Sequence, residues 1–190
     1  RGPKVWGPMG QGLMALEPWI CILSGRQFEI TFEREKAKVL PISFTLNDFE
    51  IGFQTNFLNN FTFMGNYTST NSSTDRVEGR DDVPLVGQVD NMYNLSLAYE
   101  ANKFFVRTSM NYASEALDEL SGDAYEDRYY DEQTFLDVNA NYKITDKLSI
   151  FAEGKNLTNQ PLRYYQGTVE KTMQLEYYNL SWNVGMKYDF

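Results

Sequence analysis

From residue 48 onward, apolar and polar residues alternate with a period of two over segments of about ten residues. The alternating segments are 49–57, 61–68, 93–100, 104–112, 136–143, 148–155 and 178–190. Successive side chains of a β-strand point to opposite faces, so this period predicts strands with one apolar and one polar face. Ordinary strands have about five or six residues, whereas about ten tilted residues cross a bilayer. The pattern therefore predicts an all-β chain of long antiparallel strands.

The connections between these segments are of two kinds, which alternate along the chain. Short turns follow residues 57, 100 and 143, and long connections cover 72–89, 114–132 and 158–176. In an up-and-down arrangement all short turns lie on one side and all long loops on the other, as in outer-membrane barrels. A soluble sheet has no reason for this asymmetry. We therefore predict that residues 47–190 form an antiparallel up-and-down transmembrane β-barrel segment.

Aromatic side chains lie at both ends of the apolar faces, with mostly aliphatic or small residues between them. Near the short turns they are Phe57, Phe61, Tyr99, Phe104, Tyr142 and Tyr188, and near the long loops Phe49, Tyr67, Tyr93, Tyr112 and Tyr178. Amphipathic rings prefer the headgroup level of a membrane. We interpret the two sets as aromatic girdles, which makes the lipid bilayer a partner of the chain.

Residues 1–46 do not follow the alternation and form an irregular N-terminal segment without an assignment. Within it, residues 27–46 hold two possible short strands. In the first, Phe28, Ile30 and Phe32 alternate with polar residues, and Pro41 makes the second an edge strand or a bend. The chain starts at Arg1 rather than Met, which indicates that a true N-terminus was removed or never included. No stretch of 18 apolar residues is present, so we expect no transmembrane helix.

The composition excludes several classes of function. The chain has no His and one Cys, Cys21, which excludes a His-based metal site, a Ser-His-Asp triad and an intrachain disulfide. Nothing assembles a nucleophile and a base, so we expect no enzyme, no cofactor and no metal site. The net charge of -9 argues against a nucleic-acid partner, since such proteins concentrate Lys and Arg.

Charged side chains on the polar faces are the first candidates for contact with a solute. Arg107, Glu153 and Lys155 occupy polar-face positions and would line a wet lumen. They would either touch a transported solute or pair with each other, and pairing is the favoured interpretation.

The connection 115–132 holds the other candidates. It is strongly acidic, which suits a hard cation such as calcium, but its spacing does not match an EF-hand. A solvated external loop is therefore the favoured interpretation. Three tyrosines in this loop, Tyr125, Tyr129 and Tyr130, would stack on a sugar or an aromatic siderophore, or would pack the loop itself.

Two motifs stand near the end of the chain. One runs from Phe151 to Pro161 and contains Asn156-Leu157-Thr158-Asn159, and the other is the regular strand from Glu176 to the terminal Phe190. Both resemble the last strands of TonB-dependent outer-membrane receptors, particularly of the Bacteroidetes type. The resemblance extends over about three-quarters of the chain.

The resemblance implies a function for the intact protein in the cell outer membrane. It would be a barrel of about 22 strands with an N-terminal plug. It would take up a scarce, large solute such as a siderophore, cobalamin or an oligosaccharide, with energy delivered through contact between TonB and the plug. These residues contain neither the plug nor the TonB-contacting segment, so we expect a fragment of a receptor or a truncated relative.

The resemblance also implies partners. The barrel-assembly machinery would read the apolar face of the terminal strand, which comprises Tyr178, Leu180, Trp182, Val184, Met186, Tyr188 and Phe190. A surface lipoprotein is a further candidate partner. Two alternatives remain open: a lipocalin-like β-barrel that binds an apolar ligand, and a structural outer-membrane barrel without transport. Extraction distinguishes the first of these, since a receptor segment needs detergent and a lipocalin-like domain does not.

Overall fold

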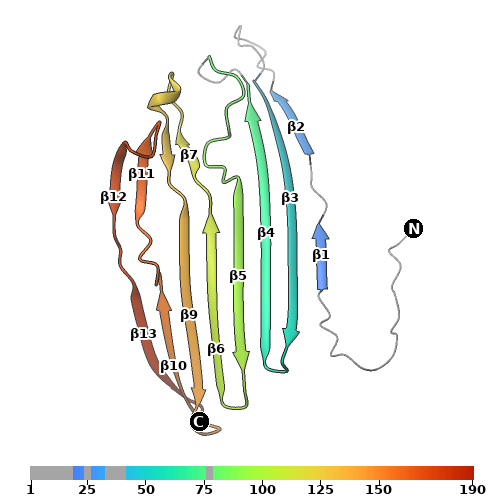
Figure 1. The fold of residues 1–190 in the computed structure, drawn as a ribbon, viewed down its shortest axis with the longest axis vertical. Helices are drawn as coiled ribbons and strands as arrows, with labels where there is room; N and C mark the ends of the chain where they lie inside the picture. The colour runs from blue at the N-terminus through green and yellow to red at the C-terminus, as the bar shows by residue number, and fades with distance from the viewer. Residues whose placement is uncertain (1–18, 24–26, 33–41, 76–78) are drawn as a thin grey trace, which may run out of the picture.

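The computed structural model describes residues 19–23, 27–32, 42–75 and 79–190, which form two antiparallel sheets (Figure 1). The strands are β1 (Trp19–Leu23), β2 (Gln27–Phe32), β3 (Ile42–Phe57), β4 (Phe61–Thr74), β5 (Asn91–Glu100), β6 (Phe104–Ala113), β7 (Ala116–Glu119), β8 (Arg128–Tyr130), β9 (Gln133–Lys143), β10 (Leu148–Lys155), β11 (Leu162–Gln166), β12 (Thr172–Glu176) and β13 (Ser181–Tyr188). A short 3-10 turn, η1 (Ala124–Glu126), precedes β8. Within the described ranges, none of the helical structure has the length and hydropathy needed to span a bilayer.

The larger sheet contains nine strands in the order β1-β3-β4-β5-β6-β9-β10-β13, with β2 also paired to β3. It includes all seven predicted segments. The strands β3 and β4 are longer than predicted, since their pairing runs from Phe57 opposite Phe61 to Phe44 opposite Thr74. The last strand is shorter than predicted and covers only Ser181–Tyr188. Asn179 adopts a φ of 61°, which interrupts the extended backbone just before β13.

The strand registers bring the apolar sets of all seven predicted strands onto one face of this sheet. One row across the sheet consists of Thr55, Phe63, Leu97, Thr108, Val138, Gly154 and Trp182, each opposite the next. A slip of one residue in any pair would move that strand's apolar set to the other face. Leu97 and Ile150 on this face are 43% and 42% exposed. Such a broad exposed apolar surface is atypical of a soluble monomer.

The aromatic residues of this face form two rows, as predicted. Near the short turns, the Phe61 ring lies 5.3 Å from that of Phe57 and 4.9 Å from that of Tyr99. Near the long loops, Tyr93 and Tyr112 stack with centroids 4.5 Å apart. Cross-strand aromatic pairs of this kind stabilise a sheet and fix its register.

The N-terminal strands β1 and β2 both pair with the same edge of β3. The candidate strand around Phe28 corresponds to β2. The predicted division at residue 46 falls inside β3, because that strand already begins at Ile42. Pro41 and residues 1–18 lie outside the described residues.

A second sheet lies in the long connections, where the sequence had predicted only loops. It contains β12, β11, β8 and β7 in that order, and we call it the loop sheet. It extends the large sheet beyond the ends of β6, β9 and β10 (Figure 1). Its strands have only three to five residues. Register shifts between Leu117 and Glu119 and between Tyr164 and Tyr165 break the period of two, which explains why the alternation did not reveal it.

Candidate functional site: the loop sheet and the polar face

A buried carboxylate organises the loop sheet. Asp127 is 0% exposed, and both of its carboxylate oxygens accept hydrogen bonds from Nη1 of Arg80, at 2.8 Å each. The backbone N–H of Ser121 donates a further hydrogen bond of 2.8 Å to the same carboxylate. A charged group that is buried away from water needs such partners, because its desolvation costs several kcal/mol. The pair therefore fixes the first long connection, which carries Arg80, to the turn between β7 and β8.

The first long connection also covers the outer edge of β7. We call residues 79–90 the cover loop. The backbone N–H of Gly87 donates to the carbonyl oxygen of Leu117 at 2.7 Å, and Val89 forms a β-bridge with Ala116. Leu117 is 3% exposed and Val83 of the cover loop is 4% exposed. The cover loop thus pairs with the β7 edge, and each of the two segments contains a buried apolar side chain.

The tyrosines of the second long connection divide into two groups. Tyr129 stacks on Tyr165 with ring centroids 5.3 Å apart, and the Tyr130 ring is tilted against that of Tyr164 with centroids 4.9 Å apart. Both therefore pack β8 against β11. Tyr125 is exposed, and its ring has the Lys171 ammonium 5.9 Å from its centroid. Of the three predicted stacking residues, Tyr125 presents the most accessible ring to a ligand.

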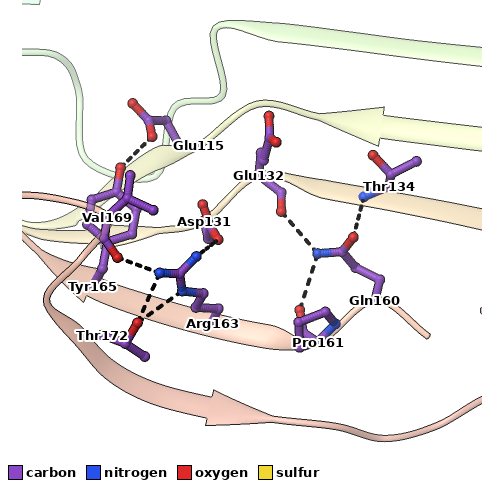
Figure 2. A network of polar contacts seen from close by, with 10 residues as sticks. All are labelled: Glu115, Asp131, Glu132, Thr134, Gln160, Pro161, Arg163, Tyr165, Val169 and Thr172. Atoms are coloured by element: carbon purple, nitrogen blue, oxygen red, sulfur yellow. Dashed lines mark hydrogen bonds and ion pairs between the residues drawn. The ribbon is translucent and has the colours of Figure 1, made fainter. Parts of the chain in front are cut away.

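Tyr165 is buried, and its hydroxyl donates a hydrogen bond to Glu115 (Figure 2). Burial and the Glu115 carboxylate both raise the pKa of Tyr165 above its ordinary value of 10.0, because both disfavour the phenolate. Burial also raises the pKa of Tyr129 and of Tyr130. The loop sheet therefore holds three tyrosines in the neutral form.

We expect alkaline pH to destabilise the loop sheet through Tyr165. The folded pKa is raised, so the stabilisation is complete below pH 10 and is lost as pH rises above it, where the unfolded chain ionises first. Absorbance titration of tyrosinate should show a late-ionising group that is missing from Tyr165→Phe. An unchanged number of late-ionising tyrosines in that variant would contradict the assignment.

Arg163 of β11 connects three segments of the loop sheet (Figure 2). Its Nη1 donates to the Asp131 carboxylate at 3.1 Å, and its Nε and Nη2 donate to the hydroxyl of Thr172 at 3.1 and 3.0 Å. Nη2 also donates to the carbonyl oxygen of Val169. The planar guanidinium carries several N–H donors, so it can donate hydrogen bonds to several acceptors at once. The sequence had not singled out this residue.

The Asn-Leu-Thr-Asn motif forms the corner between β10 and β11. Asn156 adopts a φ of 55°, and its side-chain oxygen accepts a hydrogen bond of 2.8 Å from the backbone N–H of Gln160. Its own N–H donates to the Asp137 carboxylate at 2.8 Å. The Gln160 amide in turn bonds to the backbone of Thr134 and Glu132 (Figure 2). Asn tolerates this left-handed conformation, so the geometry of the corner explains why the motif has Asn at position 156.

Gly167 is the position in the loop sheet where a side chain is least tolerable. Its φ is 66°, and a Cβ there would meet the backbone carbonyl oxygen of Tyr125. We expect Gly167→Ala to destabilise the loop sheet by about 2 kcal/mol or more, from the left-handed backbone and the overpacking together. Faster limited proteolysis between β7 and β8 would report it.

Gly87→Ala is the matched control for this substitution. Gly87 has a similar φ of 79°, but an added Cβ there meets nothing within 4 Å. It therefore carries only the backbone cost, about 1–2 kcal/mol. Equal sensitivity of the two variants to protease would show that the Tyr125 contact is unimportant.

The polar-face candidates lie close together but do not pair. Arg107 is opposite Asn139, which is opposite Glu153, so Asn139 separates the two charges. The Asn139 amide donates to Glu153 at 3.2 Å, and the Arg107 guanidinium lies 5.5 Å from the ring centroid of Phe105. Lys155 ends β10, two residues after Glu153 on the same face, and is opposite Ser181. Among the described residues, no ion pair joins these three side chains, in contrast to the favoured interpretation.

The acidic residues of the 115–132 connection are distributed among separate cations. Asp118 and Glu119 pair with Arg128, Asp127 with Arg80, and Asp131 with Arg163. In the part of the chain that the structure describes, no group of three or more carboxylates is placed to hold a metal ion. These carboxylates therefore mainly connect segments of the loop sheet through ion pairs.

The terminal strand carries four of its seven predicted recognition residues. Trp182, Val184, Met186 and Tyr188 lie on the apolar face of β13, and their exposed fractions range from 53% to 74%. Tyr178 and Leu180 precede β13. Phe190 follows it and packs edge-on against Tyr188 with centroids 5.3 Å apart. β13 pairs with β10 and ends the large sheet, and no strand of the described residues pairs with its other edge.

Comparison with known proteins identifies a similar fold. No family model matches the chain, and no curated protein matches it. A solved structure of P. aeruginosa FpvA, in complex with an iron-bound heterologous pyoverdine, matches with a TM-score of 0.60 at 13% identity. The match covers 87% of this chain and 24% of FpvA, so this chain spans about a quarter of that one. FpvA is a TonB-dependent siderophore receptor. At this identity the similarity shows the fold: all-β, antiparallel and barrel-like.

Proposed function

We propose that this chain is the C-terminal part of the barrel of a TonB-dependent outer-membrane receptor that takes up a scarce, large solute. The observation that carries the proposal is the single apolar face maintained across seven strands, with aromatic rows at both of its ends. A bilayer accounts for that exposure, whereas water does not. The similarity to part of FpvA supports the same assignment.

The loop sheet supports a receptor rather than a purely structural barrel. It stands at one end of the strands only, and it is held by buried polar contacts that a simple solvated loop would not need. A rigid external surface suits recognition, because loops on a firm scaffold carry binding residues. The candidate solutes are a siderophore, cobalamin and an oligosaccharide. Tyr125 in the external loops, and Arg107, Glu153 and Lys155 on the polar face, are the proposed contact residues.

The proposed partners follow from the same assignment. The barrel-assembly machinery would recognise the terminal strand through Trp182, Val184, Met186, Tyr188 and Phe190. TonB would act through a plug encoded upstream of these residues, and a surface lipoprotein would bind outside. The function is transport rather than catalysis.

The length of the native polypeptide tests this proposal first. Mass spectrometry of the outer-membrane fraction should find these residues in a chain several times longer, with a plug upstream. A native chain near 190 residues would contradict uptake and favour a structural barrel. Recovery of the protein in the soluble fraction without detergent would favour the lipocalin-like alternative.

Uptake by whole cells tests the transport step itself. Disruption of the gene should abolish accumulation of one solute among labelled ferric siderophores, cobalamin and oligosaccharides. Disruption of TonB should have the same effect on that solute. Normal uptake of every candidate solute by the gene-disrupted cells would overturn the proposed function.

A further inference from the structure

The two edges of the loop sheet differ. At one edge, the cover loop pairs with β7 through the Gly87–Leu117 hydrogen bond and the Val89–Ala116 bridge. At the other edge, β12 pairs with β11, and no described strand lies on its far side. Every residue of β12 is exposed. One edge of the loop sheet is therefore closed by this chain, while the other presents its backbone donors and acceptors.

The β12 edge also presents apolar side chains. Met173 is 56% exposed and Leu175 is 48% exposed, and they alternate with the polar Thr172, Gln174 and Glu176. Unpaired, partly apolar strand edges readily pair with another strand, and natural proteins usually protect them with charge, proline or a cover. This edge has no proline, and its one charge is Glu176.

Lipid does not account for this exposure. β12 belongs to the sheet that holds the Arg163–Asp131 pair, and ion pairs of this kind do not face hydrocarbon. It also lies beyond the end of β10, on the side of the long connections (Figure 1). A bilayer would cover the exposed residues of β13, whereas Met173 and Leu175 would be covered by a protein partner.

We infer that the outer edge of β12 is an interaction surface for a β-strand of the same polypeptide, the strand that closes the barrel against β13. This inference rests on the proposed function, in which β13 pairs with the other end of the barrel. β12 and β13 follow one another along the same margin of the molecule (Figure 1). A strand paired with β13 reaches β12 by continuing past the aromatic row.

The chain itself provides a precedent for such a long strand. β3 has 16 residues, and its pairing with β4 continues from Phe49 opposite Ser69 to Phe44 opposite Thr74, beyond the apolar face. A closing strand of similar length covers both edges. Each backbone group that it pairs leaves water in exchange for a hydrogen bond, and its side chains cover Met173 and Leu175. The external rim then becomes a continuous sheet.

Hydrogen exchange in the intact native protein in detergent tests this inference. Alternate amides of β12, those that point away from β11, should exchange at least about 100-fold more slowly than in an unstructured peptide. Protection of β13 without protection of these β12 amides would overturn the inference and leave the proposed function standing. Exchange of both at unprotected rates would contradict both.

Photo-crosslinking identifies the occupant of the edge. A photoreactive amino acid in place of Met173 or Leu175 in the full-length protein should crosslink within the same chain, to a peptide upstream of these residues. Leu97, on the lipid-facing side of the interior strand β5, is the control position and should not give that product. A crosslink to a separate protein, such as a surface lipoprotein, would overturn the inference, and so would the absence of any protein crosslink.

Discussion

Replacing Leu97 with arginine should lower the free energy of unfolding of the barrel by about 2–4 kcal/mol. Leu97 lies on β5 opposite Phe63 and Thr108, in the middle of the apolar face, and it is 43% exposed. In the proposed barrel this side chain contacts the hydrocarbon near the bilayer midplane. A guanidinium there loses its hydration and finds no partner, and at this depth it reaches the headgroups only with difficulty.

Ser96→Arg is the matched control. Ser96 is adjacent in sequence and lies on the polar face, opposite Met64 and Ser109. An arginine there faces the wet side of the sheet and should have little effect on stability. Urea unfolding of each full-length variant after refolding into lipid vesicles, followed by tryptophan fluorescence, measures the difference. Equal loss of stability in both variants, or none in Leu97→Arg, would contradict the membrane orientation of the sheet.

The same difference between faces explains why the large sheet was predictable. Residues such as Phe63, Leu97 and Val138 alternate with polar neighbours, and the strand registers place them on one face, the face that the proposed function assigns to lipid. The period of two therefore determines the strands and, together with the short turns, their order. The exact ends were less predictable, because they depend on single residues. Asn179 interrupts the last strand by its positive φ, while β3 continues to Ile42 through residues that alternate in a different phase.

The loop sheet was not predictable in the same way. Its strands are too short for a periodic signal, and two register shifts interrupt them. The alternatives for Tyr129 and Tyr130 included loop packing, which is the arrangement found. Asp127 was interpreted as one of the charges of a solvated loop, and the sequence did not single out Arg163. Their partners come from other connections, so only the folded chain distinguishes a buried carboxylate from an exposed one.

Replacing Arg80 with glutamine should destabilise the loop sheet by about 3–5 kcal/mol, because it leaves the Asp127 carboxylate buried without its cation. Asp127 is 0% exposed, and of its hydrogen bonds to described residues only the one from the Ser121 N–H remains unchanged in that variant. We expect the cover loop to detach and the turn between β7 and β8 to become accessible, while the large sheet stays folded. Limited proteolysis on intact cells and hydrogen exchange of residues 116–130 measure this local opening.

Two further variants distinguish the effect of leaving a buried charge unpaired from the effect of removing any charge of the loop sheet. Arg128→Gln removes a cation of the same sheet whose ion pairs with Asp118 and Glu119 are partly exposed to water, and it should change protease sensitivity less than Arg80→Gln does. Arg80→Gln combined with Asp127→Asn removes both charges and should recover part of the lost stability, since a neutral amide is cheaper to bury than an unpaired carboxylate. If the double variant opened as readily as Arg80→Gln alone, the lost contacts of Arg80, rather than the unpaired Asp127 charge, would be the cause. The cover loop would then be held by packing and the Gly87–Leu117 hydrogen bond rather than by the ion pair.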